Sequence, residues 1–108
     1  MIIFAGSNYM KTITIIVKDL TPGTLTNVDG MNLRVAIDEA LVSGHSVLLS
    51  FNGIHTISSS FLNSSLGEIF DKYGYDVLKS RIKITHYTTQ LAGAIIKYVN
   101  DLKTSQVS

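Results

Sequence analysis

The chain has 108 residues, of which 45% are hydrophobic and 16% are charged, and its formal net charge is +1 at pH 7. This length and composition predict one globular domain, because the chain carries too much apolar material to stay disordered. The absence of cysteine excludes disulfides and thiolate metal sites, and it fits a reducing, cytoplasmic compartment. The nine basic residues are scattered along the chain, so we do not expect nucleic-acid binding, and the short apolar runs predict no membrane span.

The first predicted elements are strands. Residues 2–5 are predicted to form a short partner strand, with a turn at 6–8, for the β-branched strand at 11–17 (KTITIIV). A loop is predicted at 20–28, since it holds the only proline of the chain followed by glycine, threonine and asparagine residues. The chain therefore opens with a strand or a strand pair and then a loop.

A helix is predicted to follow this loop. Asp29 is its predicted N-cap and Gly44 its C-terminal stop. Asp38 and Glu39 are neighbours in sequence, so they point apart on a helix, and we expect both on a solvated face. The apolar face repeats at helical spacing through Leu33, Ala36, Ile37, Ala40 and Leu41.

The C-terminal half continues the alternation of strands and helices. The run HSVLLSF at 45–51 is typical of a central strand that is covered on both faces. A second helix is predicted to open at the serines 58–60 and to stop at Gly74. The run RIKITHY at 81–87 alternates between apolar and polar residues, which predicts a half-buried or edge strand.

The last helix is predicted to begin at Thr88 or Thr89, and we expect a disordered polar tail at 104–108. Strands that alternate with helices predict an α/β fold with a mostly parallel or mixed sheet. No linker or repeat divides the chain. We therefore predict a single domain over residues 1–108, with its core at 11–103.

No catalytic constellation is evident. The histidines His45, His55 and His86 are not spaced as metal ligands, and no carboxylate stands beside them in the sequence. The chain has no nucleophile elbow and no glycine-rich phosphate loop. We predict a protein that is not an enzyme and that uses no metal or cofactor.

The triplet Ser58, Ser59 and Ser60 at a predicted helix N-terminus has two interpretations. One serine oxygen can accept a hydrogen bond from a backbone amide of the first turn, as a structural N-cap. The same amides and the positive end of the helix also favour a phosphate, so an anion or a phosphoserine would fit there. The residues alone favour the cap and leave the second interpretation open.

The stretch SFNGIHTISSSFL, from Ser50 to Leu62, resembles the signature D-F-x-G-V-x-x-M-D-S-S-G-L of STAS domains (sulfate transporter and anti-sigma factor antagonist). The chain is more similar still to a STAS-like family of uncharacterised bacterial and phage proteins, over nearly its whole length. The matching positions are Asp29, Gly30, Leu33, Ile37, Val47, Leu49, Phe51, the run ISSSFLN at 57–63, Leu66 and Gly67. This resemblance implies a mixed sheet of about four strands with helices packed mainly on one face.

The resemblance also implies a regulatory role. In anti-sigma factor antagonists a histidine-kinase-like ATPase phosphorylates the serine after the aspartate of D-S-S-G-L, and phosphorylation releases the partner. The matching residue of this chain is Ser59. The sequence departs from that pattern at Ser50 and Ser58, which stand where the family has aspartate, and at Phe61, which replaces glycine and is predicted to fill the core.

We therefore predict a non-enzymatic regulatory module that binds a protein partner, such as a histidine-kinase-like ATPase, through residues 52–63. The candidate partner-binding or switch residues are Asn52, His55, Thr56, Ser58, Ser59, Ser60 and Asn63. Ser59 is the candidate phosphosite. Two alternatives are a domain that binds a small anion or nucleotide at the same helix start, and a phage or mobile-element protein that inhibits a host complex. The sequence leaves the oligomeric state open.

Overall fold

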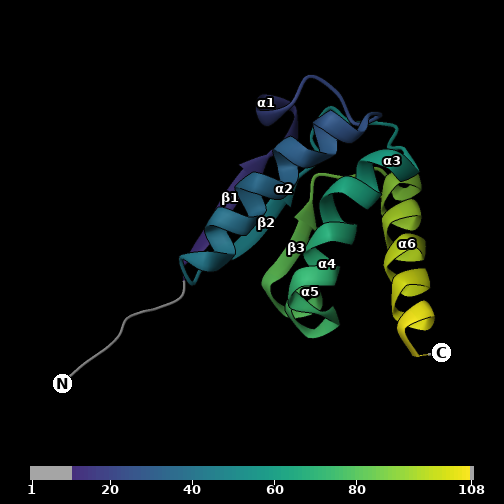
Figure 1. Cartoon of the computed structure of the whole chain (residues 1–108). Coiled ribbons are helices and arrows are strands. Elements are labelled where there is room, and N and C mark those ends of the chain that lie inside the picture. The colour runs from purple at the N-terminus through teal and green to yellow at the C-terminus, as the bar shows by residue number, and fades with distance from the viewer. Residues whose placement is uncertain (1–10, 108) are drawn as a thin grey trace.

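Runs of β-branched and aliphatic residues form a parallel sheet. Its strands are β1 (Thr12–Ile16), β2 (Ser46–Ser50) and β3 (Ile82–Thr85), in the order β1-β2-β3. Both neighbouring pairs are parallel, because the helices between the strands return the chain to the same end of the sheet (Figure 1).

The computed structural model describes residues 11–107 of the chain. The predicted strand at 2–5 and turn at 6–8 lie outside the described residues. Within 11–107 the sheet has three strands, all parallel, where a mixed sheet of about four strands was expected. The fold is nevertheless α/β, as predicted.

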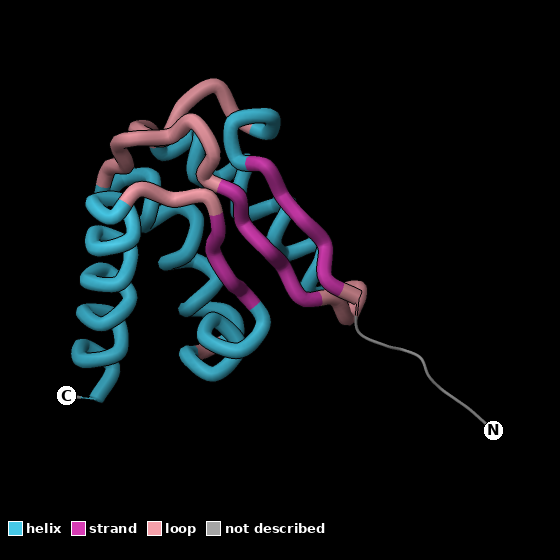
Figure 2. Tube along the Cα trace, turned by 180° about the vertical axis from the view of Figure 1, so that it is seen from behind, coloured by secondary structure: helices cyan, strands magenta, loops and turns pink. Residues whose placement is uncertain are grey.

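The helices that connect the strands lie on one face of this sheet. Figure 2 shows the opposite side, where the strands lie in front of the helices that connect them. Parallel strands in consecutive order place all their crossovers on one face when every crossover is right-handed. The helical segments are α1 (Val17–Leu20), α2 (Asn27–Val42), α3 (Ser59–Leu62), the π-helical turn η2 (Asn63–Gly67), α4 (Glu68–Tyr73), α5 (Tyr75–Arg81) and α6 (Thr89–Val107).

The core fills the space between the sheet and these helices. Val47 and Leu49 of the central strand are fully buried, and they meet Leu33 and Ile37 of α2 in the same apolar cluster. Phe61, which follows the serine triplet, is also fully buried, so the prediction that it fills the core is confirmed. Burial of this apolar surface is the main favourable term in folding.

The start of α2 differs from the prediction. Thr26, and not Asp29, is the N-cap, and its hydroxyl accepts a hydrogen bond from the Asp29 amide at 3.1 Å. Asp29 therefore lies in the first turn, where the positive end of the helix favours a negative charge. The predicted stop is confirmed, since α2 ends at Val42 and Gly44 adopts a φ of +86°.

The helix predicted from the serine triplet to Gly74 is interrupted at η2. The buried Ser65 hydroxyl donates to the Phe61 carbonyl at 2.7 Å, and such a bond competes with the regular helix ladder. Gly74 ends the segment with a φ of +89°, as expected. The sequence did not predict α5 after it, and the strand expected at 81–87 shortens to β3.

The last helix begins after Thr88, whose hydroxyl accepts a hydrogen bond from the Leu91 amide at 3.0 Å. Of the two threonines considered, Thr88 is therefore the cap. A disordered tail was expected at 104–108, and α6 extends through most of this segment, to Val107.

The start of α2 approaches the α3–η2 segment most closely at Gly30. A Cβ atom on Gly30 would lie 2.6 Å from the Phe61 carbonyl oxygen and 2.7 Å from the Ser64 Cβ. The Ser64 hydroxyl donates to the Asn27 side chain at 3.2 Å beside this contact. Glycine at this position lets the two backbones meet.

The substitution Gly30→Ala should lower the free energy of unfolding by about 1–3 kcal/mol, because the added methyl group meets a backbone carbonyl that cannot move cheaply. Gly93→Ala in α6 is the matched control, since its Cβ would meet nothing within 4 Å. The control should raise the free energy of unfolding by about 0.5–1 kcal/mol. Urea denaturation of both variants measures the difference, and equal effects would contradict the close approach.

Candidate functional site

The candidate loop crosses the carboxyl end of the sheet and is joined to the loop before α2. The Thr24 hydroxyl donates to the Thr56 carbonyl at 2.6 Å, and the Ser58 amide donates to the Thr24 carbonyl at 3.0 Å. The Ser58 hydroxyl donates to the Leu25 carbonyl at 2.9 Å. These bonds fix the loop that leads into α3 against residues 24–25.

A cleft of about 560 Å³ lies between these two loops. His55 and Thr56 line it from one loop, and Thr21 and Thr24 line it from the other. Lys18 of α1 also lines the cleft. The carboxyl edge of a parallel sheet is the usual place for a binding site in an α/β fold.

The three serines have different roles in the structure. The Ser58 hydroxyl accepts a hydrogen bond from the Phe61 amide at 3.0 Å and donates its O–H to the Leu25 carbonyl, so Ser58 is the N-cap of α3. Ser59 and Ser60 are exposed on the first turn of α3. The capping role and an exposed hydroxyl therefore belong to different residues of the triplet.

The other candidate residues do not form one cluster. Asn52, His55 and Thr56 are exposed on the loop after β2. Asn63 lies one turn beyond the serines, and its side-chain oxygen accepts a hydrogen bond from the Tyr98 hydroxyl at 2.6 Å. Asn63 is thus attached to α6 and does not line the cleft.

The sequence interpretation missed several residues of this cleft. The buried Thr21 hydroxyl donates to the Asp29 carboxylate at 2.8 Å, which links the loop after α1 to the first turn of α2. The pattern T-x-x-D at 26–29, a capping-box spacing, could have identified the helix start. No sequence pattern around Lys18 indicates that it lines the cleft. Its ammonium nitrogen would lie 3.3 Å from a Cβ on Gly53, whose φ is +80°.

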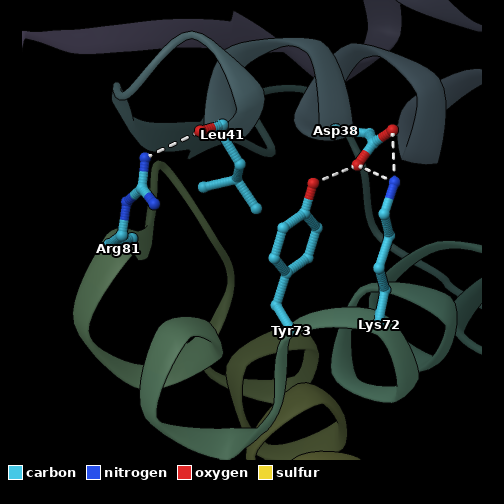
Figure 3. Close-up of polar contacts among 5 residues, drawn as sticks. All are labelled: Asp38, Leu41, Lys72, Tyr73 and Arg81. Atoms are coloured by element: carbon cyan, nitrogen blue, oxygen red, sulfur yellow. Dashed lines mark hydrogen bonds and ion pairs between the residues drawn. The ribbon is translucent and has the colours of Figure 1, made fainter.

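A polar cluster joins α2 to α4. The Asp38 carboxylate accepts hydrogen bonds from the Lys72 ammonium at 3.0 Å and from the Tyr73 hydroxyl (Figure 3). The bonds from Tyr73 and then from Lys72 lower the pKa of Asp38, and the bond to Asp38 raises the pKa of Tyr73. Asp38 was expected on a solvated face, and the structure shows instead that it holds two helices together.

Arg81 has a similar structural role close by, at the C-terminal end of α2. Its guanidinium donates to the Leu41 carbonyl at 3.1 Å (Figure 3). It also donates to the His45 carbonyl at 2.7 Å. The last carbonyls of a helix have no partner within the helix, and the Leu41 carbonyl accepts Arg81 in addition to the Gly44 amide at 3.0 Å. Arg81 therefore attaches α5 to the turn between α2 and β2.

The outer face of α2 carries an exposed apolar stripe. Val28, Met31, Val35 and Val42 are 65%, 49%, 46% and 72% exposed, and their spacing places them on one side of the helix. Leu33 and Ile37 lie on the opposite, buried side. An amphipathic helix normally turns charged and polar residues toward water, so α2 has more apolar surface than its own core uses.

A family model described as a STAS-like domain of unknown function (DUF4325) matches residues 29–91, more than half of the chain. The chain belongs to this STAS-like family. The matched region runs from the first turn of α2 into α6 and contains the serine triplet. No curated protein and no solved structure matches the chain. None of the helices within residues 11–107 has the length and hydrophobicity of a membrane span.

This STAS-like chain lacks the acidic residues that surround the phosphoserine of anti-sigma factor antagonists. Ser50 is buried at the end of β2, and its hydroxyl accepts a hydrogen bond from the Asn52 amide at 3.4 Å. Ser58 serves as the N-cap of α3, and Phe61 is buried in the core. The three departures therefore serve the stability of the domain and leave Ser59 without a neighbouring carboxylate at those positions.

The substitution Asp38→Asn should reduce stability at neutral pH and have less effect in acid. A carboxylate with a lowered folded-state pKa stabilises the fold above its ordinary pKa, and this contribution is lost as the pH falls through the lowered value. The raised pKa of Tyr73 adds a contribution that is present below its ordinary pKa and lost as the pH rises through the raised value. Thermal unfolding at several pH values measures the loss of stability in acid and the loss in alkali.

Asp101→Asn is the matched control. Asp101 pairs with Lys97 at 3.0 Å on an exposed helix surface, where such pairs contribute little. Its effect should be small at every pH. An Asp38→Asn variant that behaves like Asp101→Asn between acid and neutral pH would contradict the assignment.

Proposed function

We propose that this STAS-like domain is a non-enzymatic regulatory module that binds a protein partner at residues 52–63 and uses Ser59 as its switch. The partner is a histidine-kinase-like ATPase that phosphorylates Ser59. Phosphorylation adds a charge of about −1.5 to −2 at pH 7 and weakens the complex. The observation that carries this proposal is the separation of the cap, Ser58, from the exposed Ser59.

The position of Ser59 suits a modification that leaves the fold intact. Its neighbour Ser58 already makes the capping bonds, so a change at Ser59 does not remove the N-cap of α3. Ser59 lies in the first turn, where the positive end of a helix tolerates added negative charge. A phosphate would therefore change the surface more than the stability.

The apolar stripe of α2 supports binding of a protein. Leu25, whose carbonyl accepts the Ser58 hydroxyl, is 58% exposed and immediately precedes the N-cap of α2. The stripe then continues through Val28 and Met31 along the helix. Exposed apolar residues of this kind mark interaction surfaces, and here they begin beside the serine triplet.

This surface also accounts for the missing acidic residues. A kinase that recognised Ser59 by flanking carboxylates would find serine at positions 50 and 58. Docking along α2 would instead hold Ser59 near the catalytic site of the ATPase through apolar contact. Recognition at a distance from the modified residue supplies binding energy without contacts to the phosphorylated side chain itself.

Binding of a small anion or nucleotide is a second candidate, favoured by Lys18 at the cleft. Its side chain lines the same cleft as His55, while the Thr21 and Thr24 hydroxyls already donate to Asp29 and Thr56. Thermal-shift measurements with nucleotides and inorganic phosphate separate the two functions. A nucleotide that stabilises the protein but not the Lys18→Ala variant would favour this second function.

The variant Ser59→Glu should weaken binding to the ATPase at least about tenfold, since glutamate places a negative charge where the phosphate would lie. Ser60→Glu is the matched control, because Ser60 is the next exposed residue of the same turn. It should change the dissociation constant less than about threefold. Titration calorimetry gives both values. The switch is excluded if mass spectrometry finds Ser59 unmodified after incubation with the ATPase and ATP, and Ser59→Glu binds normally.

The variant Met31→Asp should weaken the same complex at least about tenfold, because it puts a charge into an apolar contact. Its free energy of unfolding should stay close to that of the unchanged chain, since Met31 is exposed. Ile96→Asp, at a residue 57% exposed on α6, is the control and should leave ATPase binding unchanged. Equal loss of binding in both variants would show that α2 is not the docking surface.

A further inference from the structure

An apolar groove of about 410 Å³ lies between β3 and α6, away from the serine triplet. Ile84 of β3 lines one side, and Ile96 and Val99 of α6 line the other. Tyr75 of α5 also lines the groove. Ile96 is 57% exposed, so α6 leaves apolar surface uncovered along this groove. Figure 2 shows α6 on the β3 side of the sheet, beyond its last strand.

The groove adjoins an open edge of the sheet. Among the described strands, β3 pairs only with β2, so its other edge faces away from the sheet. The Thr85 carbonyl accepts the Phe51 amide on the β2 side at 3.0 Å. Because successive residues of a strand direct their backbone groups to opposite sides, the amide and carbonyl of Ile84 point to the outer edge. Such an edge is a template for an additional strand.

The charge of the groove has one sign. Among its lining residues the charged ones are Lys79 and Lys83. The Lys83 ammonium lies 3.3 Å from the Lys79 carbonyl, to which it donates. The Lys103 ammonium lies 4.7 Å from the centroid of the Tyr75 ring, which also lines the groove. A ligand in this groove therefore meets apolar walls and positive charge.

We propose that this groove binds an extended peptide segment of a partner protein, in which aliphatic residues alternate with aspartate or glutamate. The peptide adds a strand to the outer edge of β3. Side chains of a strand alternate between its two faces, so one set lies beside Ile84 and enters the groove. The other set lies beside Lys83, where carboxylates form favourable cross-strand pairs.

The same charges disfavour a second copy of this chain as the occupant. A two-fold axis beside β3 would pair the strand antiparallel with its own copy and bring the same surface patch of both copies together. Lys79 and Lys83 of both copies would then lie in one interface, where like charges repel. An acidic peptide pairs with the open backbone groups of β3, and its carboxylates balance the positive charge of the lysines.

The test selects short random peptides from an mRNA-display library against the 108-residue chain. We expect enrichment of sequences that alternate aliphatic and acidic residues. In binding assays with an enriched peptide, Lys83→Glu should weaken the complex at least about tenfold, and replacing the acidic residues of the peptide by lysine should restore binding to this variant. Lys97→Glu, on an exposed part of α6, should leave binding unchanged.

Amide shifts in NMR spectra should locate the peptide at β3 (Ile82–Thr85) and along α6. The proposal is overturned if the library yields no enriched sequence, or if Lys83→Glu and Lys97→Glu affect the enriched peptides equally. A dimer of this chain would also overturn the proposal, if sedimentation detects the dimer and the amide shifts place β3 in its interface. These results do not depend on Ser59, so the proposed switch and this groove stand or fail separately.

Discussion

The close approach of α2 to the α3–η2 segment at Gly30 determines where the candidate site lies. Because Gly30 has no side chain, the start of α2 reaches the backbone of Phe61. That contact brings Leu25 within hydrogen-bonding distance of Ser58 and places Asn27 beside Ser64. The exposed serines and the apolar stripe of α2 consequently belong to neighbouring parts of one surface.

Periodicity and turn residues were sufficient to predict much of this fold. The apolar spacing of α2, the run VLL in β2 and the glycines at 44 and 74 each identify an element or its end. The main error in an element boundary was the start of α2, where two residues could each serve as the N-cap. Thr26 and Asp29 are both good caps, and only the bond from Thr21 to Asp29 shows why the aspartate lies inside the helix.

The sequence could not predict which serine of the triplet caps the helix and which serines are exposed. Three identical residues in a row carry no signal that distinguishes the cap from the exposed hydroxyls. The N-cap falls on Ser58 because its hydroxyl donates to the Leu25 carbonyl, which is distant in sequence. The same limit applies to Asp38, whose partners Lys72 and Tyr73 are supplied by another helix. A short helix such as α5, which directly follows a helix stop, also escapes recognition by periodicity.

Two surfaces of this STAS-like domain expose apolar side chains that its own core does not cover. One is the stripe of α2 that begins near the serines, and the other is the groove between β3 and α6. They differ in chemistry, since the groove contains lysines and an open strand edge, whereas the stripe consists of valine and methionine side chains on a helix face. This difference suits two kinds of contact, a folded partner on α2 and an extended acidic segment at β3.

NMR of the methyl-labelled chain during titration with the ATPase tests the docking surface on α2 and the switch at Ser59 together. The methyl signals of Leu25, Val28 and Met31 should shift or broaden first, and phosphorylation at Ser59 should reverse these changes. Changes confined to α6 or to the open face of the sheet, with these signals unaffected, would contradict the docking surface on α2.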